Sequence, residues 1–132
     1  MRSILSTLGA AIALITVPLL AHHSFEAEFD RTKQVTLTGT VTKFEFMNPH
    51  IWIYMDVKGA DGKISKWQFE GGAPNSLKRK GWSRTSLREG VIATINGSLA
   101  KDGTNTVNST TITLADGRSL TGGSSDTKAK VK

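Results

Sequence analysis

Residues 35–46 read VTLTGTVTKFEF, and within them the alternation of apolar and polar side chains changes phase. Up to Val41 the apolar side chains and Gly39 occupy odd positions, whereas the two phenylalanines that follow occupy even positions. Because successive side chains of a strand point to opposite faces, a slip of one residue moves an apolar set to the other face. The segment therefore predicts one long strand that bulges or bends near Lys43, with Gly39 as a second place where it coils tightly.

Outward from this segment, alternating patterns between turn signals predict four further strands. They cover residues 51–57, 64–70, 91–99 and a run that ends at residue 114. Pro74 at the start of a short polar run and Gly81 after it predict one helix of about two turns between the third and fourth strands. This order favours an all-β fold with one short helix, a small five-stranded Greek-key barrel of the oligonucleotide/oligosaccharide-binding (OB) type. A small open β-sandwich or meander is the alternative.

The composition excludes several classes of protein. The chain has 132 residues, no cysteine and a formal net charge of +6. Its length predicts a single domain and is too short for a TIM barrel or a two-domain Rossmann enzyme. The lack of cysteine excludes disulfides, thiolate zinc sites, iron–sulfur clusters and cysteine nucleophiles.

Residues 1–21 are expected to be a signal peptide rather than part of the fold. Arg2 precedes an apolar stretch at residues 8–20, and Ala21 is a small residue at which a signal peptidase would cut. The stretch is shorter than the ~20 residues that a membrane span needs. We therefore expect a periplasmic protein without a membrane span after cleavage, with an uncleaved anchor as the alternative.

The rest of the chain is expected to be one barrel domain at residues 22–120, with an N-terminal arm at 22–34. Residues 121–132 are rich in Gly, Ser and Lys and predict a disordered basic tail. A second basic group, at residues 78–88, is interpreted as a solvated helix face. Its alternative interpretation is a patch for anionic envelope surfaces.

Five short segments resemble a family of small exported bacterial proteins of unknown function. They are AHHSF at residues 21–25, EFD at 28–30, LTGTV at 37–41, NPHIW at 48–52 and KGW at 80–82. The resemblance spans residues 22–120 and implies a compact, β-rich, exported domain in a Gram-negative bacterium. It implies no reaction.

The three histidines of the chain, His22, His23 and His50, are candidate metal ligands. Cleavage after Ala21 would make His22 the terminal residue, whose α-amine and imidazole together chelate one metal ion. This arrangement resembles the histidine brace of some secreted copper proteins in its terminal histidine alone. A cut one residue earlier would give an amine-plus-third-residue histidine motif, so both cuts leave a terminus suited to a copper-type ion.

His50 and Met47 are the internal candidates for the same site. A thioether is a soft ligand that suits Cu(I), whereas Met55 shares the register of a predicted core face. The thirteen residues 22–34, at ~3.3 Å each, would reach His50 from almost anywhere. The alternatives are a solvated terminus and a His50 ring that bonds a backbone carbonyl at the strand entry.

Trp52 and Tyr54 are the best candidates for an exposed aromatic platform, because they lie opposite the aliphatic face of the second strand. Aromatic rings on this part of an OB barrel stack on bases or sugars. Export argues against a nucleic-acid partner, and most of the other rings are expected to fill the core.

No residues form a convincing catalytic set. Ser24, His23 and Asp30 are the residue types of a catalytic triad, but a chain terminus does not hold the geometry of a triad, and no nucleotide fingerprint is present. We therefore expect a non-enzymatic periplasmic binding module with a copper-type metal ion as its ligand. The alternative is an interaction domain that binds an envelope glycan, lipid or protein through its aromatic face. A metal-dependent enzyme that uses the three histidines is a third, weaker hypothesis.

Overall fold

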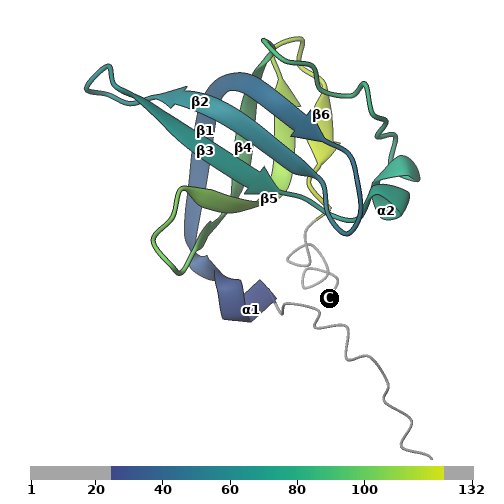
Figure 1. The fold of residues 1–132 in the computed structure, drawn as a ribbon, viewed down its shortest axis with the longest axis horizontal. Helices are drawn as coiled ribbons and strands as arrows, with labels where there is room; N and C mark the ends of the chain where they lie inside the picture. The colour runs from purple at the N-terminus through teal and green to yellow at the C-terminus, as the bar shows by residue number, and fades with distance from the viewer. Residues whose placement is uncertain (1–24, 124–132) are drawn as a thin grey trace, which may run out of the picture.

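Six strands and two short helices make up residues 25–123, the part of the chain that the computed structural model describes (Figure 1). The elements are α1 (Phe25–Glu28), β1 (Phe29–Glu45), β2 (Trp52–Lys58), β3 (Ile64–Glu70), α2 (Pro74–Lys78), β4 (Ile92–Ala100), β5 (Thr106–Leu114) and β6 (Ser119–Thr121). The five predicted strands and the helix at Pro74 are present. The sequence patterns missed α1 and β6, which are too short to show a periodicity.

Five of the strands close into a ring. The sheet order is β3-β2-β1-β4-β5-β6, and β3 also pairs with β5 in parallel, from Gln68–Thr106 to Glu70–Asn108. The other neighbouring pairs are antiparallel, and β6 extends the sheet beyond β5. The protein is therefore all-β with the character of a small barrel, as predicted.

The long strand β1 makes the closure possible because it serves two neighbours. Its first part pairs with β4 and its last part with β2, so the strand must curve across the barrel, as Figure 1 shows. The register against β2 shifts between Val41 and Lys43, which confirms the bulge predicted from the phase change. A Cβ added at Gly39 would lie far inside van der Waals contact with the Asp56 carbonyl oxygen, so glycine lets β1 and β2 approach closely here.

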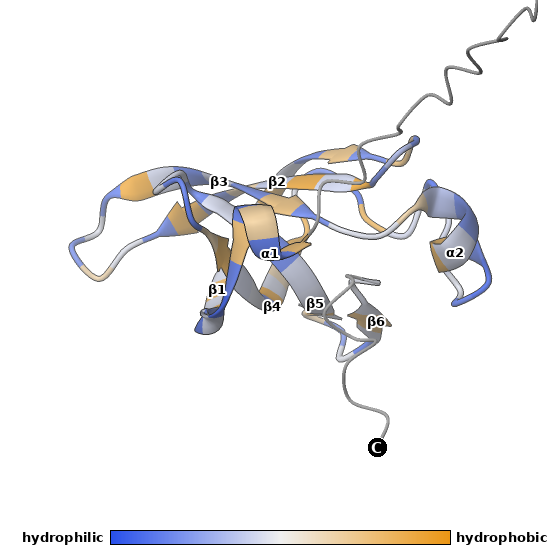
Figure 2. Ribbon diagram, turned by 90° about the horizontal axis from the view of Figure 1, so that it is seen from below, coloured by the Kyte–Doolittle hydropathy of each residue, from blue (hydrophilic) through white to orange (hydrophobic). Residues whose placement is uncertain are grey.

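The core lies inside this ring and is built from the apolar face of each strand. Ile51, Ile53 and Met55 are at most 1% exposed, which confirms that Met55 is a core residue. Phe69 from β3 and Val107 from β5 are also fully buried beside them. Figure 2 shows the apolar residues alternating with polar ones along the strands. The side chains on the opposite face of β2, β3 and β5 therefore point away from this core.

Both ends of the domain are longer than the patterns indicated. Residues 25–34, taken from sequence as part of an arm, form α1 and the start of β1, and Phe25 and Phe29 are buried with ring centroids 5.6 Å apart. At the other end, Thr121 belongs to β6, and the backbone of Gly122 bonds both Thr110 and Gly72. The predicted signal peptide, His22, His23 and most of the predicted tail lie outside the described residues.

Within residues 25–123, none of the helices has the length and apolar character that crossing a membrane requires.

Candidate functional site

The polar side of β2, β3 and β5 forms one continuous surface, which we call the outer face. Each of its residues is the neighbour of a core residue, and the strand pairing places them in rows. One row pairs Trp52 with Glu70 and Glu70 with Asn108, and the next pairs Tyr54 with Gln68 and Gln68 with Thr106. The candidate residues of β2 therefore lie beside polar residues that come from two other strands.

His50 lies at one end of the outer face, where its ring is held by a carboxylate. Nδ1 of His50 is within hydrogen-bonding distance of Oε1 of Glu70, the last residue of β3. The imidazole is 44% exposed, whereas the Glu70 side chain is only 11% exposed. The alternative that His50 bonds a backbone carbonyl is thus replaced by a histidine–carboxylate pair, with Nε2 of His50 left as its other nitrogen.

Glu70 is in turn supported from β5. Nδ2 of Asn108 donates a long hydrogen bond of 3.5 Å to Oε2 of Glu70, and Asn108 itself is buried. Oδ1 of Asn108 and Oγ of Ser109 are buried without a hydrogen-bond partner among the described residues. This end of the face therefore carries buried polar groups whose hydrogen-bonding capacity is only partly used.

The arrangement at His50 matches one feature of metal sites. Histidines that bind metals through one ring nitrogen commonly use the other to bond a carboxylate, which fixes the orientation of the ring. The described residues contain no group of three or more His, Asp or Glu side chains suited to a metal ion. A site at His50 would therefore need donors from outside residues 25–123, or Met47.

The remaining predicted metal ligands are spread along the chain. Met47 is 55% exposed in the connection between β1 and β2 that also carries His50. His22 and His23 lie outside the described residues. Because α1 begins at Phe25, only residues 22–24 separate the predicted mature start from the folded domain, rather than a free arm of thirteen residues.

Tyr54 occupies the middle of the outer face together with two charged residues of β1. Its hydroxyl donates to Oε2 of Glu45 at 3.2 Å, and Nζ of Lys43 lies 5.3 Å from the ring centroid. Lys43 also pairs with Glu45, and this contact holds the pKa of Glu45 below its ordinary value. Burial, followed by the hydrogen bond to Glu45, raises the pKa of Tyr54.

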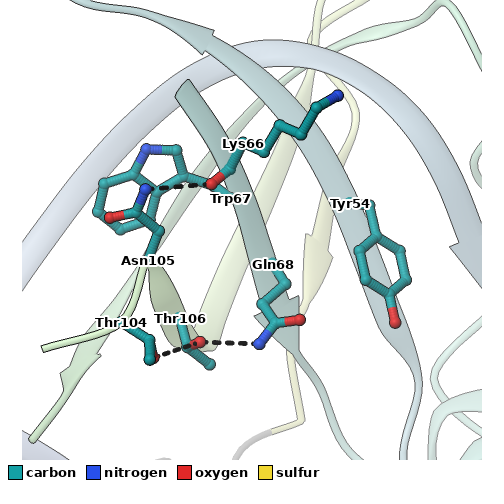
Figure 3. A pocket seen from close by; sticks show the side chains of 7 residues that line it. All are labelled: Tyr54, Lys66, Trp67, Gln68, Thr104, Asn105 and Thr106. Atoms are coloured by element: carbon teal, nitrogen blue, oxygen red, sulfur yellow. Dashed lines mark hydrogen bonds between the residues drawn. The ribbon is translucent and has the colours of Figure 1, made fainter. Parts of the chain in front are cut away.

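A pocket of about 240 Å³ opens at the other end of the outer face (Figure 3). Its lining comes from β2, β3, the connection between β4 and β5, and the first residue of β5, and comprises Tyr54, Lys66, Trp67, Gln68, Thr104, Asn105 and Thr106. Figure 3 shows Tyr54 and Asn105 on opposite sides of Gln68. Apart from Lys66, the polar groups of this lining are neutral hydroxyls and amides.

Hydrogen bonds fix several of these groups in place. Nε2 of Gln68 donates to Oγ1 of Thr106 at 2.9 Å, and the Thr106 hydroxyl in turn donates to Oγ1 of Thr104 at 2.8 Å, because Thr104 gives its own proton to Asp102. Nδ2 of Asn105 donates to the carbonyl oxygen of Lys66 at 3.1 Å, which ties the β4–β5 connection to β3. None of these bonds uses the amide oxygens of Gln68 and Asn105, and Figure 3 shows the oxygen of Gln68 on the side of Tyr54.

The two residues of the predicted aromatic platform differ in their relation to the pocket. Both Trp52 and Tyr54 lie on the outer face and are partly exposed, but only Tyr54 lines the pocket. Trp67 also lines the pocket, but it shares the core-side face of β3 with Phe69, with ring centroids 6.5 Å apart. The aromatic count in the sequence indicated this region without distinguishing which rings face a ligand.

Glu70, Asn108 and the residues of the β4–β5 connection were not identified from sequence. Glu70 precedes Gly71 at the end of a predicted strand, and this strand-end carboxylate was the available signal. The contribution of β5 depends on the parallel β3–β5 pairing, which no local pattern reports.

Two of the short motifs have structural roles within the described chain. Trp82 is 3% exposed, and its Nε1 donates to the carbonyl oxygen of Thr121 at 2.9 Å. Its ring lies 5.9 Å from that of Phe44, so it packs the segment after α2 against the barrel. Asn48–Pro49 forms a cis peptide bond in the connection that carries His50.

The whole chain was also compared with known proteins. The model of a family of unknown function, DUF6152, matches residues 11–109. No curated protein matches the chain, and no solved structure does. The match covers most of the chain, including β1 to β4 and the outer-face residues of all three strands. The chain therefore belongs to the family of unknown function DUF6152.

Proposed function

We propose that the protein is an exported, non-enzymatic binding module that holds a copper-type metal ion at the His50 end of its outer face. The observation that carries this proposal is the pairing of His50 with the nearly buried carboxylate of Glu70. Such a carboxylate fixes the orientation of the ring and makes its free nitrogen a better metal ligand. In this role Nε2 of His50 is the ligand and Glu70 is a positioning residue.

The mature N-terminus is proposed to complete the site with His22 and His23. Phe29, the first residue of β1 after α1, pairs with Ala100 at the end of β4. From there the neighbouring strands β5 and β3 lead to Glu70. Three strand spacings of ~4.8 Å separate the two places by about 14 Å around a curved surface. Three residues before Phe25 could span at most roughly 10 Å before the imidazole side chains are added. These lengths support a site shared by the two segments, with Met47 as a further soft donor.

Calorimetry with Cu(II) at neutral pH tests this proposal on three proteins. The first begins at the exported N-terminus, which sequencing of the purified protein should place at His22 or Ala21. The second is His22→Ala/His23→Ala, and the third is His50→Ala. We expect both changes to weaken binding, because each removes a nitrogen ligand. Equal affinity in all three proteins would exclude the site.

Neutral oligosaccharides are a second candidate ligand, and the pocket at Tyr54 and Trp67 favours them. The Tyr54 ring offers an apolar face for stacking, and the fixed amides and hydroxyls match the hydroxyl groups of a sugar. Lys66 is the single charged residue of the lining.

Tryptophan fluorescence during titration with N-acetylglucosamine oligomers tests this second function. We expect a saturable change that Gln68→Ala weakens and His50→Ala leaves unaltered, since His50 does not line the pocket. A response that both variants reduce equally would contradict a separate sugar site at the pocket.

A further inference from the structure

A run of cations without acidic partners begins at Lys78, the last residue of α2. Five basic residues fall within residues 78–88, and all five are exposed: Lys78, Arg79, Lys80, Arg84 and Arg88. Glu89 is the only carboxylate between Glu70 and Asp102. We call residues 78–88 the basic segment.

The cations of the basic segment differ from most others in the domain. Elsewhere, Lys43 pairs with Glu45, Lys66 with Asp56 and Arg118 with Asp116. Among residues 25–123, none of the five side chains of the basic segment makes an ion pair or a hydrogen bond. Their charge is therefore not neutralised by the domain itself.

The backbone that carries these cations is nevertheless held firmly. Leu77, Trp82 and Leu87 are at most 3% exposed and anchor the segment at three points. The amides of Lys80 and Trp82 both bond the carbonyl oxygen of Leu77, and Nε1 of Trp82 bonds the strand β6. The basic segment is thus a fixed, ordered surface rather than a flexible chain.

The lack of exposed rings on this surface favours the phosphate headgroups of a membrane over single-stranded nucleic acid. Binding of single strands uses exposed rings on which bases stack. The one ring in the segment, Trp82, is buried, and the pocket rings lie on another part of the barrel. Cationic side chains without aromatic neighbours suit the headgroups of an anionic membrane, which attract Lys and Arg electrostatically.

We propose that the basic segment docks the protein on anionic phospholipid. This inference is independent of the ligands proposed for the outer face. The domain offers a matched control, because Lys58 and Lys63 are also exposed and unpaired within the described residues. They belong to the β2–β3 hairpin, which projects from the barrel on the side away from α2 (Figures 1 and 2).

Co-sedimentation of the purified protein with vesicles tests the proposal. One vesicle is phosphatidylcholine alone and the other also contains phosphatidylglycerol, and the readout is the ratio of binding to the two. Lys80→Gln/Arg84→Gln is compared with Lys58→Gln/Lys63→Gln, which removes the same charge. We expect the wild type to prefer the anionic vesicle, with the preference lost at high salt.

The basic-segment variant should lose this preference by roughly thirtyfold, while the hairpin variant retains most of it. An equal loss in both variants would show that net charge alone is responsible and would overturn the proposal. A wild type that binds a single-stranded oligonucleotide but shows no preference for anionic vesicles would overturn it in favour of a nucleic-acid surface.

Discussion

The two ends of the outer face share the same strands but present different chemistry. At the His50 end, an imidazole is held by a nearly buried carboxylate, and buried polar atoms of β5 lie behind it. At the pocket end, to which β2 contributes Tyr54, a set of fixed hydroxyls and amides lines a cavity. The first end suits a cation and the second suits a neutral polar ligand.

The two ends differ in chemistry because a different connection between strands borders each of them. The β1–β2 connection brings His50 and Met47 to one end, whereas the β4–β5 connection brings Thr104 and Asn105 to the other. β3 links the two, because Gln68 faces the pocket and Glu70 faces His50. One strand therefore supplies a neutral acceptor and an anionic acceptor two residues apart, and substitutions should separate the two functions.

Gly39→Val should abolish both ends together and has the largest expected effect. The new side chain would collide with the Asp56 carbonyl oxygen of β2, so β1 and β2 would have to separate. We expect a loss of about 3 kcal/mol or more in the free energy of unfolding, measured by chemical denaturation. Thr40→Val, at an exposed position of the same strand, is the control and should stay near the wild type.

Glu70→Gln should affect the His50 end alone. The amide retains the shape of the side chain but withdraws its negative charge from the histidine. We expect Cu(II) affinity to fall by about ten- to a hundredfold, as calorimetry would measure. Glu45→Gln removes a carboxylate from the neighbouring strand and should leave that affinity unchanged; if it weakened binding as much, a general charge effect would replace the positioning role of Glu70.

Low pH should destabilise the β4–β5 connection and thereby weaken ligand binding at the pocket end. Oδ1 of Asp102 accepts bonds from the amide and hydroxyl of Thr104, and these bonds hold its pKa below the ordinary 3.8. Because the folded pKa is the lower one, this stabilisation is complete above the ordinary value and is lost as pH falls through the folded value.

The Asp102→Ala variant checks this prediction. Its stability should fall less steeply in acid than that of the wild type, and it should already bind N-acetylglucosamine oligomers more weakly at neutral pH. Asp116→Ala alters a similar turn, in which Asp116 bonds the amide of Arg118, and should leave sugar binding intact. Loss of sugar binding in both variants would contradict a local effect of the β4–β5 connection.

The smallest expected effect is a change in the ionisation of Tyr54. It is the only tyrosine in the chain, so tyrosinate absorbance reports this residue alone. Its pKa is raised by burial and by the hydrogen bond to Glu45. Glu45→Gln removes the anionic acceptor and should lower the pKa of Tyr54 toward its ordinary value. An unchanged titration curve would mean that burial alone accounts for the raised pKa.

Local patterns were sufficient to predict most of the fold. The phase change between Val41 and Phe44 predicted the bulge of β1, and the proline and glycine signals predicted α2. Both depend on residues adjacent in sequence, where side-chain alternation and backbone constraints act directly. β6 and α1 escaped prediction because three or four residues carry no such pattern.

The candidate site was only partly predictable because it is assembled from distant segments. His50 and Tyr54 were identifiable as polar or aromatic residues opposite a core face. Their partners, Glu70 and the lining from β5, lie at least twelve residues away and depend on strand pairing. The parallel contact of β3 with β5 closes the barrel, and a single sequence gives no periodic signal for such a contact.

Electron paramagnetic resonance of the Cu(II)-loaded protein, compared with His50→Ala, tests the metal proposal most directly. Hyperfine couplings from nitrogen count the imidazole ligands, so the measurement reports coordination rather than stability. The account predicts that the wild type has one imidazole more than His50→Ala and that Glu70→Gln keeps the ligand count while binding more weakly. Identical spectra for the wild type and His50→Ala would contradict the assignment of His50 as a metal ligand.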